Sequence, residues 1–346
     1  MALASYCRAG DLVALQTYCS QASVTAAQVC EARGFNLACE NGHLEVARWL
    51  QQAFGFTARN AGTMADIALR DACRHGHLEV ARWLQQTFQL TRGNVRLMYG
   101  WTLCWACANG HLEVACWLQQ TFQLTAFDAR ANDNFALREA CANGHLEVAR
   151  WLQQTFQLTA RDARAANNYA LYVTCAHGHL EVARWLQQTF RLTVADARAD
   201  DDFALCEAYA NGHLEIARWL QQTFQLTALN TRSKGNFALR SACAHGHLNI
   251  LRWLQRTWGI PPDALAAAAS GPMPAPCAAY IRSLHMLRWS PRTHADFPPR
   301  ARRLALLLLL INQRLTRELS VPGALPYLPP ELWHHLLSYL PSYLPA

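Results

Sequence analysis

The chain has 346 residues, of which 52% are hydrophobic and 16% charged, so it is too apolar for a disordered chain and long enough for two domains or one extended array. Its net charge of +7 is modest and is not concentrated in one region, which argues against a nucleic-acid-binding protein. The longest aliphatic run, Leu304–Ile311, is too short to cross a bilayer, so we expect no membrane span.

The start of the chain, MALASYCRAGDL, lacks a charged segment followed by an apolar core, so we expect no secretory signal. The thirteen cysteines are odd in number, and a chain of this size does not need disulfides. We therefore expect reduced thiols and a cytoplasmic protein.

A block of the form GHLEVARWLQQTFQLT recurs along the chain with little change. Its glycine returns every 34 residues, and a degenerate copy around Gly10 stands 32 residues before the first of them. A strict period in this range is typical of a solenoid of stacked units. The regularly spaced glycines are Gly42, Gly76, Gly110, Gly144, Gly178, Gly212 and Gly246.

Each unit predicts an antiparallel helix pair. In FALREACANG, Phe135, Leu137 and Cys141 share one helical face, at spacings near three and four. Gly144 ends this helix, because glycine tolerates the left-handed conformation there. In HLEVARWLQQTF, residues 145–156, a broad apolar stripe opposes a charged face and predicts the second helix.

The connection LTARDAR, residues 158–164, predicts a short third helical turn rather than a β-hairpin. Thr159 and Asp162 have the spacing of a helix-capping box, as do Thr125/Asp128 and Thr193/Asp196. The sequence therefore predicts an all-α solenoid of about eight 34-residue units with a small helical C-terminal segment. All fourteen prolines fall at or after residue 261, so the expected domains are an array over 1–260, a Pro/Ala-rich cap and linker over 261–300, and the C-terminal segment over 301–346.

These residues resemble the ankyrin repeat. ALREACANGHLEVARWLQQ lines up with that family's TPLHLAA-x-x-GHLEVV-x-LL core, and the resemblance covers roughly residues 1–260. It is closest to the ankyrin-like arrays of large DNA viruses and their protist hosts. The unit is 34 residues rather than about 33, and the family's Thr-Pro is missing. Both departures put the family's β-hairpin finger in doubt.

A histidine follows each turn glycine after Gly10. A metal site is one interpretation, since imidazole is the commonest metal ligand. However, equivalent side chains of stacked helices lie about 8–10 Å apart, whereas a zinc ion needs its donors within about 2.1 Å. We therefore expect no metal and predict that the histidines hold the turns. They are His43, His77, His111, His145, His179, His213 and His247.

Two further columns are predicted to fill the core. A cysteine stands three residues before most turn glycines, and stacked units hold such thiols too far apart for a disulfide, which needs Cα atoms about 4.4–6.8 Å apart. A tryptophan on each second helix supplies a large apolar surface. The cysteines are Cys7, Cys39, Cys73, Cys107, Cys141, Cys175 and Cys243, with Tyr209 in the remaining unit, and the tryptophans are Trp49, Trp83, Trp117, Trp151, Trp185, Trp219 and Trp253.

An arginine column on the second helices admits a phosphate-binding interpretation. Each arginine, however, follows a Glu or Asn by three residues on the same face, which favours a salt-bridged outer surface. The sequence offers no glycine-rich phosphate loop and no catalytic pair of carboxylates, so we expect no enzyme and no cofactor. The arginines are Arg48, Arg82, Arg150, Arg184, Arg218 and Arg252.

Partner specificity is predicted where the units differ. The varying positions are an exposed pair on each first helix, which includes Cys104, Cys206 and Ser241, and the connections at Asp133, Asn167, residues 200–202 and Lys234. The ankyrin resemblance implies that they line a concave groove that holds another protein, while drift at exposed sites is the alternative. The predicted groove residues are Arg70, Asp71, Trp105, Arg138, Glu139, Tyr172, Val173, Glu207 and Arg240.

The end of the chain, LPYLPPELWHHLLSYLP, resembles the opening of an F-box, whose signature is LPxELxxxILSYLP. It is similar to the truncated F-box-like end of poxvirus-type ankyrin proteins. A SOCS-box-like interpretation also fits, except for a missing cysteine, and a plain capping helix is the third alternative. A helix with leucines on one face docks into an apolar groove. The resemblance implies ligase-binding residues Leu328, Pro329, Leu332, Leu336, Leu337 and Leu340.

Together these patterns predict a non-enzymatic, monomeric substrate adaptor. Its groove would hold a target protein, and residues 328–341 would recruit a cullin-RING ubiquitin ligase. The alternative is a binding scaffold without a ligase link, in which the tail only caps the array.

Overall fold

A computed structural model describes residues 2–96, 101–226, 233–258 and 274–286. The chain divides into two compact parts, Met1–Asn230 and Thr231–Ala346. Within the described ranges every regular element is a helix and no strand occurs, so the predicted all-α solenoid is confirmed. We number the repeats 1 to 8 by their turn glycines, from Gly10 to Gly246.

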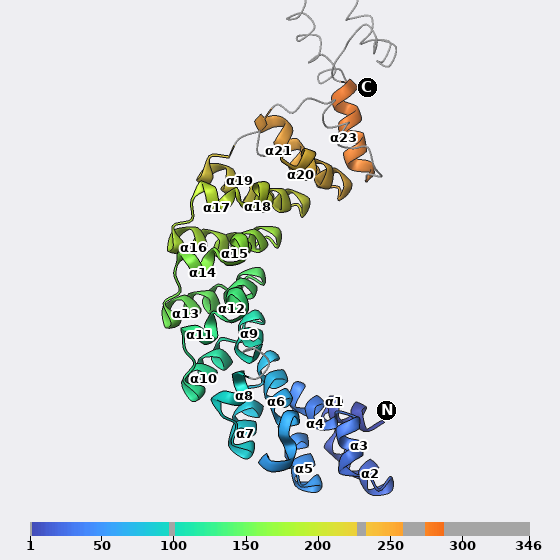
Figure 1. The fold of residues 1–346 in the computed structure, drawn as a ribbon. Helices are drawn as coiled ribbons and strands as arrows, with labels where there is room; N and C mark the ends of the chain where they lie inside the picture. The colour runs from blue at the N-terminus through green and yellow to red at the C-terminus, as the bar shows by residue number, and fades with distance from the viewer. Residues whose placement is uncertain (1, 97–100, 227–232, 259–273, 287–346) are drawn as a thin grey trace, which may run out of the picture. The chain divides into compact units, whose positions relative to one another are not determined.

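Each repeat of the first part contributes a first helix, a turn and a second helix (Figure 1). The first helices are α1 (Ala2–Ala9), α4 (Gly34–Glu40), α6 (Ala58–Arg74), α9 (Trp101–Ala108), α12 (Ala131–Ala142), α15 (Ala165–Ala176) and α18 (Ala199–Ala210). The second helices are α2 (Leu12–Gln21), α5 (Leu44–Phe54), α7 (Leu78–Phe88), α10 (Leu112–Phe122), α13 (Leu146–Phe156), α16 (Leu180–Phe190) and α19 (Leu214–Phe224).

A short third helix follows most second helices. These helices are α3 (Ala26–Glu31), α8 (Arg92–Arg96), α11 (Ala126–Ala129), α14 (Ala160–Ala163) and α17 (Val194–Ala197). In repeat 2 this segment is merged into α6 across a kink at Gly62.

The third helices separate neighbouring second helices. First helices of successive repeats pack closely on one another, whereas each of α11, α14 and α17 contacts the second helix of the following repeat. The first part therefore curves, with the first helices on its inner side and the second helices on its outer side (Figure 1).

The turn glycines have two roles. Their φ angles lie between +74° at Gly10 and +89° at Gly178, the left-handed region that favours glycine. From Gly10 to Gly178, each also faces the histidine ring of the next repeat: a Cβ on Gly144 would lie 2.6 Å from Nδ1 of His179. The glycine is therefore required both by its backbone conformation and by the neighbouring ring.

The histidines bind the preceding repeat as well as ending their own turn. Nε2 of His43 donates to the carbonyl oxygen of Arg8 over 2.9 Å, and His111 bonds the backbone of Arg74 in the same way. Burial lowers the pKa of His111 more than this hydrogen bond raises it. The predicted structural role of the histidines is confirmed, and the structure adds that they link repeats.

The connections between repeats contain the predicted capping boxes. In α11, α14 and α17 the N-cap threonine and the aspartate three residues later cap each other reciprocally. Three consecutive residues in the left-handed region then begin the next first helix. These turns are residues 132–134, 166–168 and 200–202, and all their residues except Ala166 are Asn or Asp, the types that best tolerate this backbone after glycine.

Ion pairs between a partly exposed arginine and a buried aspartate join consecutive connections. Nε of Arg130 lies 2.7 Å from Oδ1 of Asp162, and Nε of Arg164 lies 2.6 Å from Oδ1 of Asp196. Burial raises the pKa of Asp162, but the hydrogen bonds from Arg130 and Thr159 outweigh it, so the pKa is lowered overall. Each carboxylate therefore caps its own helix and binds the preceding repeat.

The core consists of small and aliphatic side chains. The predicted cysteine column is fully or almost fully buried, as is Tyr209. The tryptophans differ from the prediction, since the described ones are half-buried at the outer side. Trp151, for example, packs edge-to-face on Phe156 of its own helix, with ring centroids 5.5 Å apart. Trp151 and Leu152 are consecutive residues of the second helix and point in different directions, and Leu152 is the one that is fully buried.

The outer surface carries the predicted exposed ion pairs. Arg48–Glu45, Arg150–Glu147, Arg184–Glu181 and Arg218–Glu215 all form within one helix, with side chains at least 44% exposed.

The second part contains repeat 8 and one further helix. Repeat 8 is the pair α20 (Ser233–Ala244) and α21 (Leu248–Trp258), and α23 (Ala275–Met286) packs on α21. A Cβ on Gly246 would lie 2.9 Å from Cγ of Pro274, so a proline stands where earlier repeats receive a histidine. Helix α23 therefore covers the end of repeat 8.

Candidate functional site

Aromatic side chains form a column on the inner side of the first part. One aromatic residue recurs near the start of each first helix from repeat 4 to repeat 7, and all four are half-buried. With adjacent aromatic and arginine side chains they form a surface that we call the inner stripe. It comprises Arg74, Trp101, Trp105, Phe135, Arg138, Tyr169, Tyr172 and Phe203.

The stripe begins with tryptophans and arginines. The guanidinium of Arg74 lies 4.6 Å from the ring centroid of Trp105 in the next repeat. Trp101 stacks on Trp105 at 5.8 Å and meets Phe135 edge-on at 4.8 Å. Such contacts join repeats 3, 4 and 5 through side chains that remain partly open to solvent.

Arg138 continues the stripe between two rings. Its guanidinium lies 5.9 Å from the centroid of Phe135 and 4.7 Å from that of Tyr169. Nε of Arg138 is buried and has no hydrogen-bond partner. Arg138 is therefore held largely by cation–π contacts, which are stronger where water is excluded.

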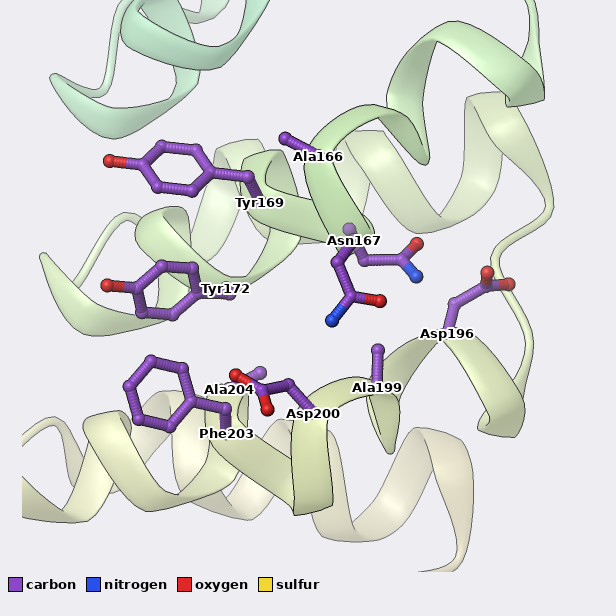
Figure 2. Close-up of a pocket in the computed structure, with 10 residues that line it drawn as sticks. Ala166, Asn167, Tyr169, Tyr172, Asp196, Ala199, Asp200, Phe203 and Ala204 are labelled. Carbon is purple, nitrogen blue, oxygen red and sulfur yellow. The ribbon is translucent and has the colours of Figure 1, made fainter. Parts of the chain in front are cut away.

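The stripe ends in a tyrosine pair and a phenylalanine. Tyr169 and Tyr172 meet edge-on at 5.2 Å, and Tyr172 packs on Phe203 of repeat 7 at 4.8 Å. Figure 2 shows the three rings in one column, with the Asp200 side chain beside it. Burial raises the pKa of Tyr172, and nearby Tyr169, Glu207 and Asp200 raise it further.

A pocket of about 110 Å³ lies against this column, between repeats 6 and 7. Its lining combines the three rings with Asn167, Asn168, Asp196 and Asp200 and with small alanine side chains. Oδ1 of Asn168 is buried there without a hydrogen-bond partner.

The expectation that both members of each first-helix pair are exposed is wrong. Asp71 and Val173 are each only 5% exposed, and Cys104 and Cys206 are completely buried. Consecutive residues of a helix point about 100° apart, and the neighbouring first helix covers one of these directions. Asp71 also forms ion pairs with Arg70 and Arg33, at 2.7 and 3.8 Å.

The remaining predicted groove residues are partly exposed. Arg70, Trp105, Arg138, Glu139, Tyr172 and Glu207 lie on the inner side, and only Trp105, Arg138 and Tyr172 belong to the stripe. Arg240 is exposed, but it belongs to the second part. The Lys234 side chain is not among the described side chains. The predicted ligase-binding segment, residues 328–341, also lies outside the described residues.

Sequence reasoning missed five residues of the stripe: Arg74, Trp101, Phe135, Tyr169 and Phe203. It placed Phe135 on one helical face with Leu137 and Cys141, which are fully buried, whereas Phe135 itself is half-buried on the inner side. The pattern that identifies four of them is an aromatic residue every 34 positions, from 101 to 203, while the residue type varies among Trp, Phe and Tyr.

Other candidate chemistry is not supported within the described ranges. No three His, Cys, Asp or Glu side chains there could hold a metal ion together. All thirteen cysteines are described, and none of them forms a disulfide. Burial raises the pKa of the Cys7 and Cys104 thiols to about 12, which disfavours the reactive thiolate. No described helix is both long enough and apolar enough to span a bilayer.

Comparison with known proteins gives the family. The model of ankyrin repeats (3 copies) matches residues 35–128, 103–196 and 137–225, which together cover more than half of the chain. The chain belongs to the ankyrin-repeat family. No curated protein matches the sequence. As an ankyrin-repeat protein it is a protein–protein interaction module, and such proteins are generally non-enzymatic. Repeat 1 lies outside the matched residues, yet its Gly10 faces His43 as in the matched ankyrin repeats.

Proposed function

We propose that this ankyrin-repeat protein binds a partner protein on the inner stripe. One observation carries the proposal: a continuous series of aromatic and arginine side chains, all at least partly exposed, crosses five repeats from Arg74 to Phe203. Aromatic residues and arginine dominate the binding energy of protein interfaces. The second helices are nearly the same in every repeat, whereas the side chains of the stripe differ from one repeat to the next.

We further propose that the protein is a substrate adaptor. The partner on the stripe would be presented to a cullin-RING ubiquitin ligase recruited by residues 328–341. The support is the resemblance of LPPELWHHLLSYLP to an F-box opening. The proposal includes no catalytic step and no cofactor, and it places the protein in the cytoplasm because none of its thirteen cysteines forms a disulfide. The virus or protist type of array is proposed on the sequence resemblance alone.

Affinity purification from eukaryotic cells with quantitative mass spectrometry tests both halves. Replacing Trp105, Arg138 and Tyr172 by alanine is expected to remove the target and keep the ligase subunits. The double change Leu332→Asp and Leu336→Asp is expected to do the reverse. The matched control replaces Arg150, Arg184 and Arg218, which lie on the outer surface, and is expected to change neither.

The outcomes separate the two halves. If the stripe variant captures the same proteins as the unmodified chain, the stripe is not the binding surface. If no ligase subunit depends on Leu332 and Leu336, the protein is a binding scaffold without a ligase link, which is the alternative function.

A further inference from the structure

We propose that the pocket between repeats 6 and 7 receives a lysine or arginine side chain of the partner. This inference rests on the proposed function, because the pocket lies against the inner stripe. At this pocket the stripe would recognise a positively charged side chain of the partner.

The dimensions of the pocket suit one side chain. Its volume is about 110 Å³, whereas sites for small molecules and cofactors typically occupy about 300–1,000 Å³. Two successive first helices, α15 and α18, supply its walls, so the pocket has a defined position along the stripe.

The lining attracts positive charge. The rings of Tyr169, Tyr172 and Phe203 line the pocket, and an aromatic ring attracts a cation placed over its face. Asp200 adds a carboxylate on an exposed turn. Asn168 also lines the pocket, and its Oδ1 is buried without a hydrogen-bond partner, as is Oδ1 of the equivalent Asn134 one repeat earlier.

At the junction between repeats 5 and 6, a cation of the chain itself packs on the equivalent aromatic rings. A shift of 34 residues places Arg138 at the position of Tyr172, and there its guanidinium lies over Phe135 and Tyr169. At the junction of repeats 6 and 7 the arginine is replaced by Tyr172. The same shift places Ala166 at the position of Asp200, so this junction gains a carboxylate. The chain therefore supplies the cation at one junction, and the partner supplies it at the next.

The charge around the pocket argues against a nucleic acid. Asp200 and Asp201 are exposed and Glu207 is half-buried, so three carboxylates lie near the end of the stripe. Stacked aromatic rings alone would also suit unpaired bases, but carboxylates repel the phosphate groups that accompany them. A basic side chain, by contrast, is attracted both by the aromatic rings and by the carboxylates.

Peptide selection on the full chain tests the inference. A randomised dodecapeptide library displayed on phage is selected against the protein, and selected peptides are synthesised with each Lys or Arg replaced by norleucine. We expect one basic position whose replacement weakens binding about threefold to tenfold, the range of a cation–π contact or a solvent-exposed ion pair. Asp200→Asn is expected to weaken the parent peptide similarly and to leave the norleucine peptide unchanged.

Asp133→Asn is the matched control. Asp133 and Asp200 are both exposed residues of left-handed turns, and asparagine tolerates that backbone. Both changes remove one negative charge, but Asp133 does not line this pocket. The control is therefore expected to bind the parent peptide like the unmodified chain.

Three results would overturn the inference. If peptides require Trp105, Arg138 and Tyr172 but norleucine costs nothing, the stripe binds proteins and the pocket is not basic-selective. The same holds if Asp133→Asn weakens binding as much as Asp200→Asn, because the effect is then one of net charge. If no selected peptide depends on the stripe, or if single-stranded poly(dT) displaces the peptides, the proposed function fails as well.

Discussion

The turns and the inner stripe of the first part obey different rules. At every described junction in this part a glycine faces the histidine of the next repeat, with a virtual Cβ 2.5–2.7 Å from the nearest ring atom. Along the stripe, by contrast, each junction brings together different side chains: Arg74 on Trp105, Arg138 on Tyr169, and Tyr172 on Phe203.

This difference shows how one stack can carry a specific surface. The glycine and histidine contacts set the spacing of the repeats, so they must be the same everywhere. The stripe projects from helices whose positions are already determined, and its side chains vary without moving the backbone. We therefore expect stability to depend mainly on the turns and connections, and we propose that recognition occurs at the stripe.

The largest expected effect is at a turn glycine. Gly144→Ala places a Cβ 2.6 Å from the His179 ring at a φ of +77°, and we expect a loss of about 2–4 kcal/mol in urea unfolding, from backbone conformation and overpacking together. Gly55→Ala is the control, because Gly55 has a φ of +65° but no heavy atom within 4 Å. Equal losses at both sites would mean that the histidine contact contributes nothing.

A smaller loss is expected where repeats are joined by ion pairs. Arg130→Gln leaves the buried Asp162 without its charged partner, and we expect a cost of about 1–3 kcal/mol in the same assay. Arg150→Gln removes an exposed pair with Glu147 and is expected to cost less than about 0.5 kcal/mol. If the two variants are equally stable, the connections do not hold the stack together.

Stability is expected to fall between pH 7 and pH 5. Burial lowers the pKa of His77, His111, His145 and His179 below the ordinary value of 6.5. The unfolded chain therefore takes up protons first as the pH falls, and the stability present above pH 6.5 is progressively lost. We expect thermal melts to show a midpoint lower by a few degrees at pH 5. His111→Gln is expected to make this pH dependence shallower, and an unchanged slope would exclude His111 as one of its causes.

The smallest expected effect is a gain at a left-handed turn. Ala166 has a φ of 50°, and repeat 5 has asparagine at the equivalent position 132. Ala166→Asn is expected to stabilise the protein by about 0.5–1 kcal/mol, because asparagine tolerates this backbone better than alanine. Ala165→Asn, at a neighbouring residue outside the left-handed region, is the control and is expected to give no gain. Chemical unfolding of both variants distinguishes backbone preference from a general effect of asparagine.

Local patterns predicted most of the fold. The helix pairs, the turn glycines and the capping boxes at Thr125, Thr159 and Thr193 were predicted because each depends on residues three or four apart in one segment. The site was predicted less well. Trp105, Arg138 and Tyr172 were found because they vary between repeats, whereas the aromatic residues at 101, 135, 169 and 203 were not recognised as part of the site.

The sequence by itself determined the repeat length, the helices and the positions at which repeats differ. Only the tertiary structure decided which side chains of those positions are covered. Asp71 and Val173 are buried while Phe135 remains half-exposed, and Arg130 reaches Asp162 across 32 positions of sequence. The reason is that the neighbouring repeat supplies the other half of each contact. Its distance and angle follow from the packing of whole helices, which no single segment of the sequence contains.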